Sequence, residues 1–228
     1  MKTMNRSEIN LRLGDSLEAM KLMPDNAYDL AIVDVPYGIN MMDSDNASRV
    51  KLAKPKDYKK INDSSAPNHK YFEQLFRVSK NQIIFGANHF MSRLYIAAPM
   101  MKDIDSPCWI VWDKNNSGDF ADCELAWTSF GSAVRKFKFT WNGMLQGDMK
   151  NKEVRIHSCQ KPVKLYEWLL TNYAKEGDKI LDTHGGSMSI ALACHNLKYD
   201  LDLWELDEDY YKAGVKRFEQ HKKQLQLF

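Results

Sequence analysis

Short apolar runs alternate with longer amphipathic stretches along most of the chain. The short runs are rich in branched residues, which is typical of strands inside a sheet, and the amphipathic stretches between them indicate helices. The runs that predict strands are Ile9–Leu13, Leu30–Asp34, Gln82–Phe85, Trp109–Trp112, Glu124–Thr128, Lys179–Asp182 and Leu201–Trp204. This alternation predicts an α/β fold over residues 1–228, as one domain with a seven-stranded, mostly parallel, doubly wound sheet and helices on both of its faces.

Helix starts are marked by residues that favour the first turn. Asp15 precedes SLEAMKLM and is a good N-cap, and Pro162 lies near the start of VKLYEWLLTNYA. Ser187 stands at the start of a third helix, and the last helix is expected from about Glu208 toward Lys223. These signals place a helix after several of the predicted strands, as the fold requires.

Two polar stretches interrupt the alternation, at residues 41–70 and 131–155, and both are predicted to be insertions. Residues 49–60 contain six basic residues and one acidic residue. The second stretch mixes basic residues with Phe137, Phe139 and Trp141, which alternate and would share one face of a strand. Such a face is typical of a core and is also suited to stacking on bases. A run of lysines is likewise typical of a solvated loop, so charge alone leaves both interpretations open.

Composition agrees with a globular protein and excludes disordered or collagen-like chains, since 44% of the residues are hydrophobic and 27% are charged. No apolar run approaches the roughly 20 residues that cross a bilayer, and no apolar segment follows the first basic residues. We therefore expect a cytoplasmic protein without membrane contact. The net charge of +2 makes no case for a nucleic-acid partner by itself.

The four cysteines show no pattern of metal ligands. They have no C-x-x-C pair and no histidine at finger spacing, so no metal site and no disulfide framework are predicted. We expect four buried, reduced thiols.

The segment KILDTHGGSMSIALAC predicts a buried strand, a turn at Gly185 and Gly186, and a helix. A ligand of open α/β sheets lies at such a turn, beyond the carboxyl ends of the strands. Glu205 ends the next strand about 20 residues after Asp182, a spacing at which a carboxylate can accept both hydroxyls of a ribose. The turn matches neither phosphate-binding glycine motif, which favours a nucleoside with little phosphate. The alternative interpretation is that Gly185 and Gly186 form an ordinary strand-to-helix turn without a ligand, and that Glu205 is a solvated strand end.

The segment LAIVDVPYGI delivers Asp34 to the end of a strand, and Pro36 and Tyr37 then turn the chain over the sheet. An exocyclic amine of a base is a poor nucleophile because its lone pair is delocalised. Acceptors such as Asp34 and the carbonyl near Pro36 could hold the amino hydrogens while Tyr37 stacks on the base. The alternative is a simple turn after a strand-terminal aspartate.

Four segments together resemble one enzyme family. DVPYG resembles the Asp-Pro-Pro-Tyr motif of the S-adenosylmethionine-dependent amino methyltransferases of DNA, and HSCQKPVKLYEWLL resembles their His-Pro-Thr-Gln-Lys-Pro segment. ILDTHGGSMS is similar to their Asp-Pro-Phe-x-Gly-Ser-Gly loop, and NLRLGDSLEAM to the segment before the catalytic strand. The catalytic motif precedes the cofactor loop, as in the circularly permuted beta type. The resemblance runs from Leu11 to Tyr211 and implies a Rossmann-like methyltransferase fold with small recognition insertions.

The resemblance also implies roles for individual residues. Asp34, Pro36 and Tyr37 would be catalytic. The cofactor S-adenosyl-L-methionine would lie against six residues, with Glu205 on the ribose, Lys161 near the methionine carboxylate and Asp15 beside the adenine amine. The full cofactor set is Asp15, Lys161, Asp182, Gly185, Ser187 and Glu205.

The implied substrate is double-stranded DNA with its target base flipped out of the stack. Aspartate at the first motif position favours N6 of adenine, while N4 of cytosine, a base of RNA, and an inactive homologue that only binds nucleic acid remain alternatives. The basic residues expected to contact DNA are Lys51, Lys54, Arg135, Lys136 and Lys138. A homodimer could complete target recognition. Any restriction activity that accompanies the methylation is expected on another chain.

Overall fold

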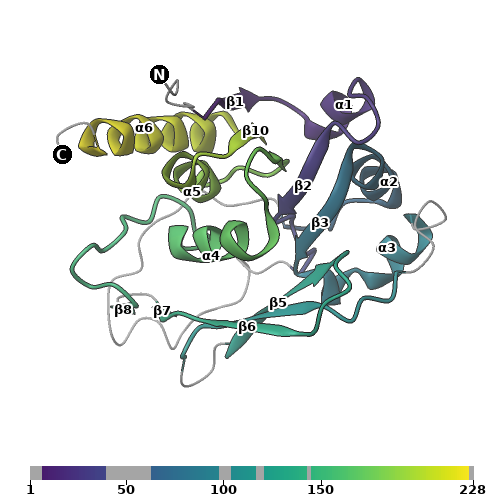
Figure 1. Cartoon of the computed structure of the whole chain (residues 1–228), viewed down its shortest axis with the longest axis horizontal. Helices are drawn as coiled ribbons and strands as arrows, with labels where there is room; N and C mark the ends of the chain where they lie inside the picture. Colours follow the sequence, from purple (N-terminus) through teal and green to yellow (C-terminus); the bar gives the residue numbers. More distant parts are fainter. Residues whose placement is uncertain (1–6, 40–62, 98–103, 117–120, 143–144, 226–228) are drawn as a thin grey trace.

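A computed structural model describes residues 7–39, 63–97, 104–116, 121–142 and 145–225 (Figure 1). Its main sheet has eight strands in the order β1-β10-β9-β2-β3-β5-β4-β6. In that order the strands are Ile9–Leu13, Asp200–Glu205, Lys179–Asp182, Tyr28–Val33, Ser79–Phe85, Cys123–Thr128, Trp109–Asp113 and Arg135–Lys138. A second sheet pairs β7 (Trp141–Asn142) with β8 (Leu145–Gln146). The predicted α/β class with a mostly parallel sheet is confirmed.

The prediction of seven strands is one short for the main sheet. All seven predicted runs form strands, and β6 adds an eighth by pairing in parallel with β4, from Ile110 opposite Arg135 to Asp113 opposite Lys138. Residues 131–155, predicted as an insertion, therefore extend the sheet in part. The pattern hid this strand because three of its four residues are basic and exposed, as an edge strand permits. β5 runs antiparallel to both β3 and β4.

Six α-helices and a short 3₁₀ helix accompany the strands among the described residues. The helices are α1 (Ser16–Lys21), α2 (His69–Val78), α3 (Met91–Ala97), α4 (Val163–Tyr173), α5 (Ser189–Leu197) and α6 (Glu208–Leu225), and the 3₁₀ helix is η2 (Ala87–His89). Asp15 caps α1 as predicted, since its carboxylate accepts a 2.8 Å hydrogen bond from the Leu17 amide. The expected start of a helix at Ser187 is wrong by two residues, because Met188 adopts a left-handed conformation and α5 begins after it.

Helices cover both faces of the sheet, as the alternation of side chains along β2 shows. Leu30 and Ile32 face a core shared with α4, α5 and α6, whereas Ala31 and Val33 face a core shared with α1, α2 and α3. Figure 1 shows the two groups of helices on opposite sides of β2 and β3. A strand that is apolar on both faces belongs inside a parallel sheet, which places β2 centrally.

Successive strands of the chain are added outward in opposite directions from β2 and β9, so the switch point of the sheet lies between these two strands. They are parallel neighbours, with Leu30 opposite Ile180 and Ala31 opposite Leu181. Their carboxyl ends therefore meet at one edge of the sheet. Ligands of open α/β sheets bind in the crevice beyond such a switch point. The chain after β2 begins with Asp34 and the chain after β9 begins with Thr183, so the two informative motifs share this edge.

The thiols differ from the prediction of four buried groups. Cys108 and Cys194 are buried and all four cysteines are free, but Cys123 is exposed at the start of β5 and Cys159 is only partly buried. Cys123 begins β5 and Cys159 lies in the loop before α4, so solvent reaches both side chains. Among the described helices, none is long and apolar enough to cross a membrane.

Candidate active site

The predicted catalytic turn follows β2. The Tyr37 hydroxyl donates a 2.9 Å hydrogen bond to Oδ1 of Asp34, which fixes the carboxylate. Gly86, at φ +68°, lies against the Tyr37 ring so closely that a side chain there would overlap it. The His89 ring stacks on Tyr37 with centroids 5.3 Å apart and planes 17° apart. The turn thus holds the Asp34 carboxylate and an oriented Tyr37 ring at the edge of the sheet, on either side of Pro36.

Lys161, which the resemblance places near the methionine carboxylate of the cofactor, lies against the catalytic turn. Its Nζ atom is 2.6 Å from Oδ2 of Asp34 and 3.1 Å from Oε2 of Glu124, and its side chain is only 4% exposed. Nζ also donates to the Tyr37 hydroxyl at 3.3 Å. Although burial opposes the charged form, the two carboxylates raise the pKa of Lys161 above its usual range. The lysine is therefore a charged partner of Asp34.

Glu124 was missed by the sequence analysis, which used it only as the start of a strand. Because β5 is antiparallel to β3, its first residues lie at the carboxyl edge, beside the ends of the parallel strands. Glu124 pairs with Lys161 and also with Lys114, the residue that follows β4. Burial alone would raise the pKa of Glu124, but the two ammonium groups lower it to about 2. An acidic residue at the start of the antiparallel strand was the signal that could have identified it.

Two effects act in opposite directions on the pKa of the Asp34 carboxyl group. Burial raises the pKa of its carboxyl group, and the ammonium of Lys161 acts against that rise. The same desolvation, together with the Asp34 carboxylate, raises the pKa of Tyr37 well above its usual value, so the phenol remains a hydrogen-bond donor. Asp34 is thus a buried acceptor whose proton affinity is greater than that of a carboxylate in water.

The predicted cofactor turn follows β9 and is braced by β10. The Gly185 amide donates to the Trp204 carbonyl at 2.8 Å, and the Gly186 amide donates to Oε2 of Glu205 at 2.6 Å. A Cβ atom on Gly185 would overlap the side chain of Leu203, so only glycine fits there. Asp182 and Glu205 therefore end two neighbouring strands on either side of a close backbone turn.

Asp182 is a buried carboxylate that has no ion-pair partner among the described residues. Its Oδ1 atom accepts a 2.9 Å hydrogen bond from the His184 amide. Burial raises the pKa of Asp182 to about 8, and the carboxylates of Asp34 and Glu205 contribute to that rise. A cationic ligand at this edge would stabilise the ionised form.

Thr183 and His184, which stand where the Asp-Pro-Phe-x-Gly-Ser-Gly motif has Pro and Phe, are held by polar groups. The hydroxyl groups of Tyr71, in α2, and Thr183 are 2.5 Å apart, and Thr183 Oγ1 lies 2.9 Å from Nδ1 of His184. Burial lowers the pKa of His184 to about 4, so its ring is neutral at pH 7. This buried chain fixes the loop by hydrogen bonds, a role that spacing along the sequence could not indicate.

Two further residues of the predicted cofactor set are engaged locally. Asp15 lies at the end of β1 and caps α1, and Ser187 places its hydroxyl 3.0 Å from that of Ser189. The Ser187 carbonyl accepts a 2.7 Å hydrogen bond from Arg217, which also pairs with Glu153 at 2.6 Å. Arg217 thereby joins the cofactor turn to the end of residues 131–155, a contact the sequence analysis missed.

Lys138, at the carboxyl end of β6, lies at the same edge of the sheet as Glu124. Lys138 is in register with Asp113, and Asp113 is in register with Cys123, next to Glu124. Arg135, Lys136 and Lys138 are all exposed, and Phe137 and Phe139 turn inward to pack against the core. Trp141 is buried with them, so these aromatic residues belong to the core. Lys51 and Lys54 lie outside the described residues.

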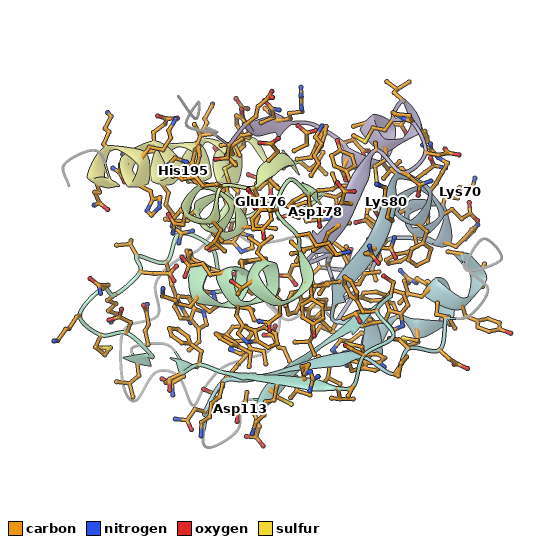
Figure 2. The ribbon with its side chains drawn as sticks, in the orientation of Figure 1. Lys70, Lys80, Asp113, Glu176, Asp178 and His195 are labelled. Atoms are coloured by element: carbon orange, nitrogen blue, oxygen red, sulfur yellow. The ribbon has the colours of Figure 1, made fainter. Side chains whose placement is uncertain are left out.

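A cavity of about 680 Å³ opens at the opposite edge, where β2, β3 and β9 begin. It is lined in part by Asp29, Lys80 and Asp178. Figure 2 shows Lys80 and Asp178 well away from Asp113, which ends β4 at the edge of the catalytic turn. This cavity is therefore separate from the candidate site.

Comparison with known proteins agrees with this arrangement. Residues 53–216 match the N6/N4 family model described as DNA methylase. The Type II methyltransferase M.HpaI of Haemophilus parainfluenzae is 22% identical over 90% of this chain and 72% of its own length. The crystal structure of the M1.HpyAVI–SAM complex matches with a TM-score of 0.56 and 21% identity, over 92% of this chain and 99% of that one. The cytosine-N4-specific PvuII DNA methyltransferase matches with a TM-score of 0.60 and 15% identity, over 96% and 92% of the two chains.

The family match spans well over half of the 228 residues, and both solved structures share the fold. The four motifs from Leu11 onward occur at one edge of that fold, in the order the resemblance implied. The chain therefore belongs to the N6/N4 DNA methylase family.

Proposed function

We propose that this DNA methylase transfers a methyl group from S-adenosyl-L-methionine to N6 of an adenine that is flipped out of double-stranded DNA. One observation carries the proposal. Asp34 and the turn that contains Gly185 leave neighbouring parallel strands at the same edge, so an acceptor for the amine and a cradle for the cofactor adjoin each other. A transfer between two bound molecules requires that adjacency.

The residues at the carboxyl ends of β9 and β10 fit the cofactor. S-adenosyl-L-methionine carries a sulfonium and an ammonium group, and Asp182 is a buried carboxylate without an ion-pair partner in the described chain. Glu205 already accepts two backbone hydrogen bonds and keeps lone pairs for ribose hydroxyls. The backbone at Gly185 packs too closely on Leu203 to carry a side chain. When bound, the cofactor supplies an electrophilic methyl group on sulfur.

The catalytic turn provides what a weakly nucleophilic amine needs. Each oxygen of Asp34 has one described partner, Tyr37 or Lys161, and retains a lone pair that can accept an amino hydrogen. The carbonyl at Val35 or Pro36 is the second acceptor. Methylation obliges the amine to lose a proton, and the buried Asp34 carboxylate is suited to receive it because burial raises its pKa. Tyr37, held by Gly86 and His89, stacks on the base.

Contacts to the DNA backbone are assigned to the edge strand β6. Its exposed Arg135, Lys136 and Lys138 point to phosphate binding because β6 ends, at Lys138, at the edge that holds the catalytic turn. We include Lys51 and Lys54 in the same assignment on their charge alone. Flipping a base costs a few kcal/mol, which stacking on Tyr37 and phosphate contacts offset.

Cytosine N4 is the second candidate acceptor, favoured by the resemblance to the cytosine-N4-specific PvuII enzyme. Asp34 at the first motif position favours adenine. The two amines have the same geometry relative to a carboxylate acceptor, so the product decides between them.

The test is to incubate the protein with duplex DNA and cofactor labelled in the methyl group, digest the DNA to nucleosides, and identify the labelled product. Labelled N6-methyl-2′-deoxyadenosine from wild type and no labelled product from Asp34→Ala is the expected result. Labelled N4-methyl-2′-deoxycytidine would show that cytosine, not adenine, is the acceptor. Equal labelling by wild type and Asp34→Ala would remove Asp34 from its role, and an RNA duplex serves as the competing substrate.

A further inference from the structure

We propose that Glu124 is a positioning residue of the methyl-transfer site, which holds Lys161 between two carboxylates so that Lys161 orients Asp34 without leaving an excess positive charge beside the cofactor. The inference rests on the proposed function and assigns a residue that lies in none of the four motifs. Glu124 comes from the antiparallel strand β5, whereas the motifs follow β1, β2 and β9 or precede α4.

The ammonium of Lys161 has three protons and three oxygen neighbours. Asp34 Oδ2 lies at 2.6 Å, Glu124 Oε2 at 3.1 Å and the Tyr37 hydroxyl at 3.3 Å. The lysine side chain is 4% exposed, and those of Asp34 and Glu124 are 18% and 22% exposed. Such a group holds its position only while its partners remain. Loss of Glu124 would leave Asp34 as the single carboxylate beside a buried cation.

Glu124 is itself fixed from the side away from the catalytic turn. Its other oxygen pairs with Lys114, whose ammonium also lies 5.1 Å from the centre of the Trp112 ring. The pairing of Trp112 with Glu124 in the β4–β5 ladder sets the height of both groups at the sheet edge. The β4–β5 hairpin therefore orients the Glu124 carboxylate independently of Lys161, which lies in the segment before α4.

The charges explain why a second carboxylate is needed. Asp34, Glu124, Lys161 and Lys114 together are neutral, while methyl transfer brings a sulfonium cation to the same edge. Without the charge of Glu124, the ammonium groups of Lys161 and Lys114 would face Asp34 as the single carboxylate, and this excess positive charge would repel the sulfonium. Lys161 would also draw more strongly on the Asp34 lone pairs that must accept from the target amine. With Glu124 in place, the positive charge of Lys161 is shared, and Asp34 keeps its capacity as an acceptor.

Several titratable groups surround Asp34 and bear on its pH dependence. Lys161 lowers the pKa of Asp34 and Glu124 raises it, while Tyr37 stabilises the carboxylate by a hydrogen bond. Other groups that interact with the Asp34 charge are Cys159, Tyr166 and Asp182. Removal of the charge on Glu124 therefore lowers the pKa of Asp34, and every other group in this set stays in place.

The experiment compares Glu124→Gln with wild type in kcat, KM for the cofactor and DNA, and the pH profile of kcat from pH 5 to 9. Glu124→Gln keeps the shape of the side chain and removes its charge. We expect kcat to fall about 10- to 100-fold, and the acidic limb of the profile to move to lower pH, with KM for DNA nearly unchanged. Glu124→Asp should recover part of kcat. Glu219→Gln, at an exposed ion pair on α6, is the matched control and should match wild type.

A merely structural role would lower the active fraction equally at every pH. A fall in kcat with an unshifted acidic limb therefore overturns the proposal, as does wild-type kcat in Glu124→Gln. Thermal unfolding of both variants checks that they fold. Failure of the proposed function is distinct, because wild type would then label no nucleoside of the DNA. A product of N4-methylcytosine leaves the test intact, since it compares the same rate and profile.

Discussion

Glu205 and Gly186 connect the ends of two neighbouring strands through one short hydrogen bond, of 2.6 Å, from the Gly186 amide to Oε2 of the carboxylate. The second oxygen accepts from the Asp207 amide at 2.8 Å. Glu205 therefore shapes the cofactor turn before any ligand arrives. A carboxylate that is already fixed loses little freedom when it accepts ribose hydroxyls.

Glu205→Gln should weaken cofactor binding. The amide keeps one acceptor oxygen and loses the charge, and hydrogen bonds to charged groups contribute about 1.5–3 kcal/mol, which corresponds to roughly a 10- to 100-fold rise in Kd. Isothermal titration with S-adenosyl-L-methionine measures it. Glu208→Gln, at an exposed pair with Lys212, is the control. Equal affinities of Glu205→Gln and wild type would remove Glu205 from the cofactor site.

Asp182 should make the ligand-free protein less stable as the pH rises. Its pKa of about 8 in the folded chain exceeds the ordinary 3.8, so the folded state binds the proton more tightly. That stabilisation is complete below about pH 3.8 and is lost as the pH rises toward and through 8. In Asp182→Asn this loss should disappear. Thermal unfolding of the ligand-free protein between pH 5 and 9 measures both slopes, and parallel slopes in the two proteins would contradict the assignment.

The sequence predicted the parts of the site that follow strands. Asp34, Asp182 and Glu205 end β2, β9 and β10 or follow them directly, so the apolar pattern that located the strands located these residues too. Parallel strands share one edge for their carboxyl ends, which is why residues far apart in sequence could be predicted to adjoin.

Glu124 and Arg217 escaped prediction for a physical reason. Glu124 opens a strand, and its place at the active edge depends on the antiparallel direction of β5. Arg217 lies on α6, and its partners are a carbonyl of the cofactor turn and Glu153. Neither relation has a fixed spacing along the chain. Lys161 was predicted in the site, but its pairing with Glu124 depends on β5 and could not be inferred from the motif of Lys161.

Gly185→Ala should destabilise the protein through overlap with Leu203. Overpacking in a filled core costs about 1–3 kcal/mol, and the turn would move away from β10. The double variant Gly185→Ala/Leu203→Ala should be less destabilised than the sum of its single variants, because the smaller side chain removes the overlap. Chemical denaturation of all four proteins gives the coupling energy. Additive effects would show that the overlap does not limit this position.

Arg217→Met should lower stability and loosen the cofactor turn together. Arg217 and Glu153 have side chains 13% and 18% exposed, and removing one partner leaves a largely buried charge, at a cost of about 3–5 kcal/mol. For a chain of this size each kcal/mol lowers Tm by about 2–4 °C. The double variant Arg217→Met/Glu153→Gln should recover part of the loss, since it leaves no unpaired charge. A double variant less stable than Arg217→Met would contradict this account.

The three basic residues of β6 should contribute to the salt dependence of DNA binding. Each phosphate contact contributes about 0.9 to the slope of log K against log salt, so Lys138→Ala should reduce the slope by about one and weaken binding equally on all sequences. Lys136 lies 3.6 Å from Asp113, so its loss should change the slope less. Lys222→Ala, on α6, is the control on another surface. Fluorescence anisotropy with a duplex between 50 and 300 mM salt measures the slopes, and an unchanged slope in Lys138→Ala would place the DNA away from β6.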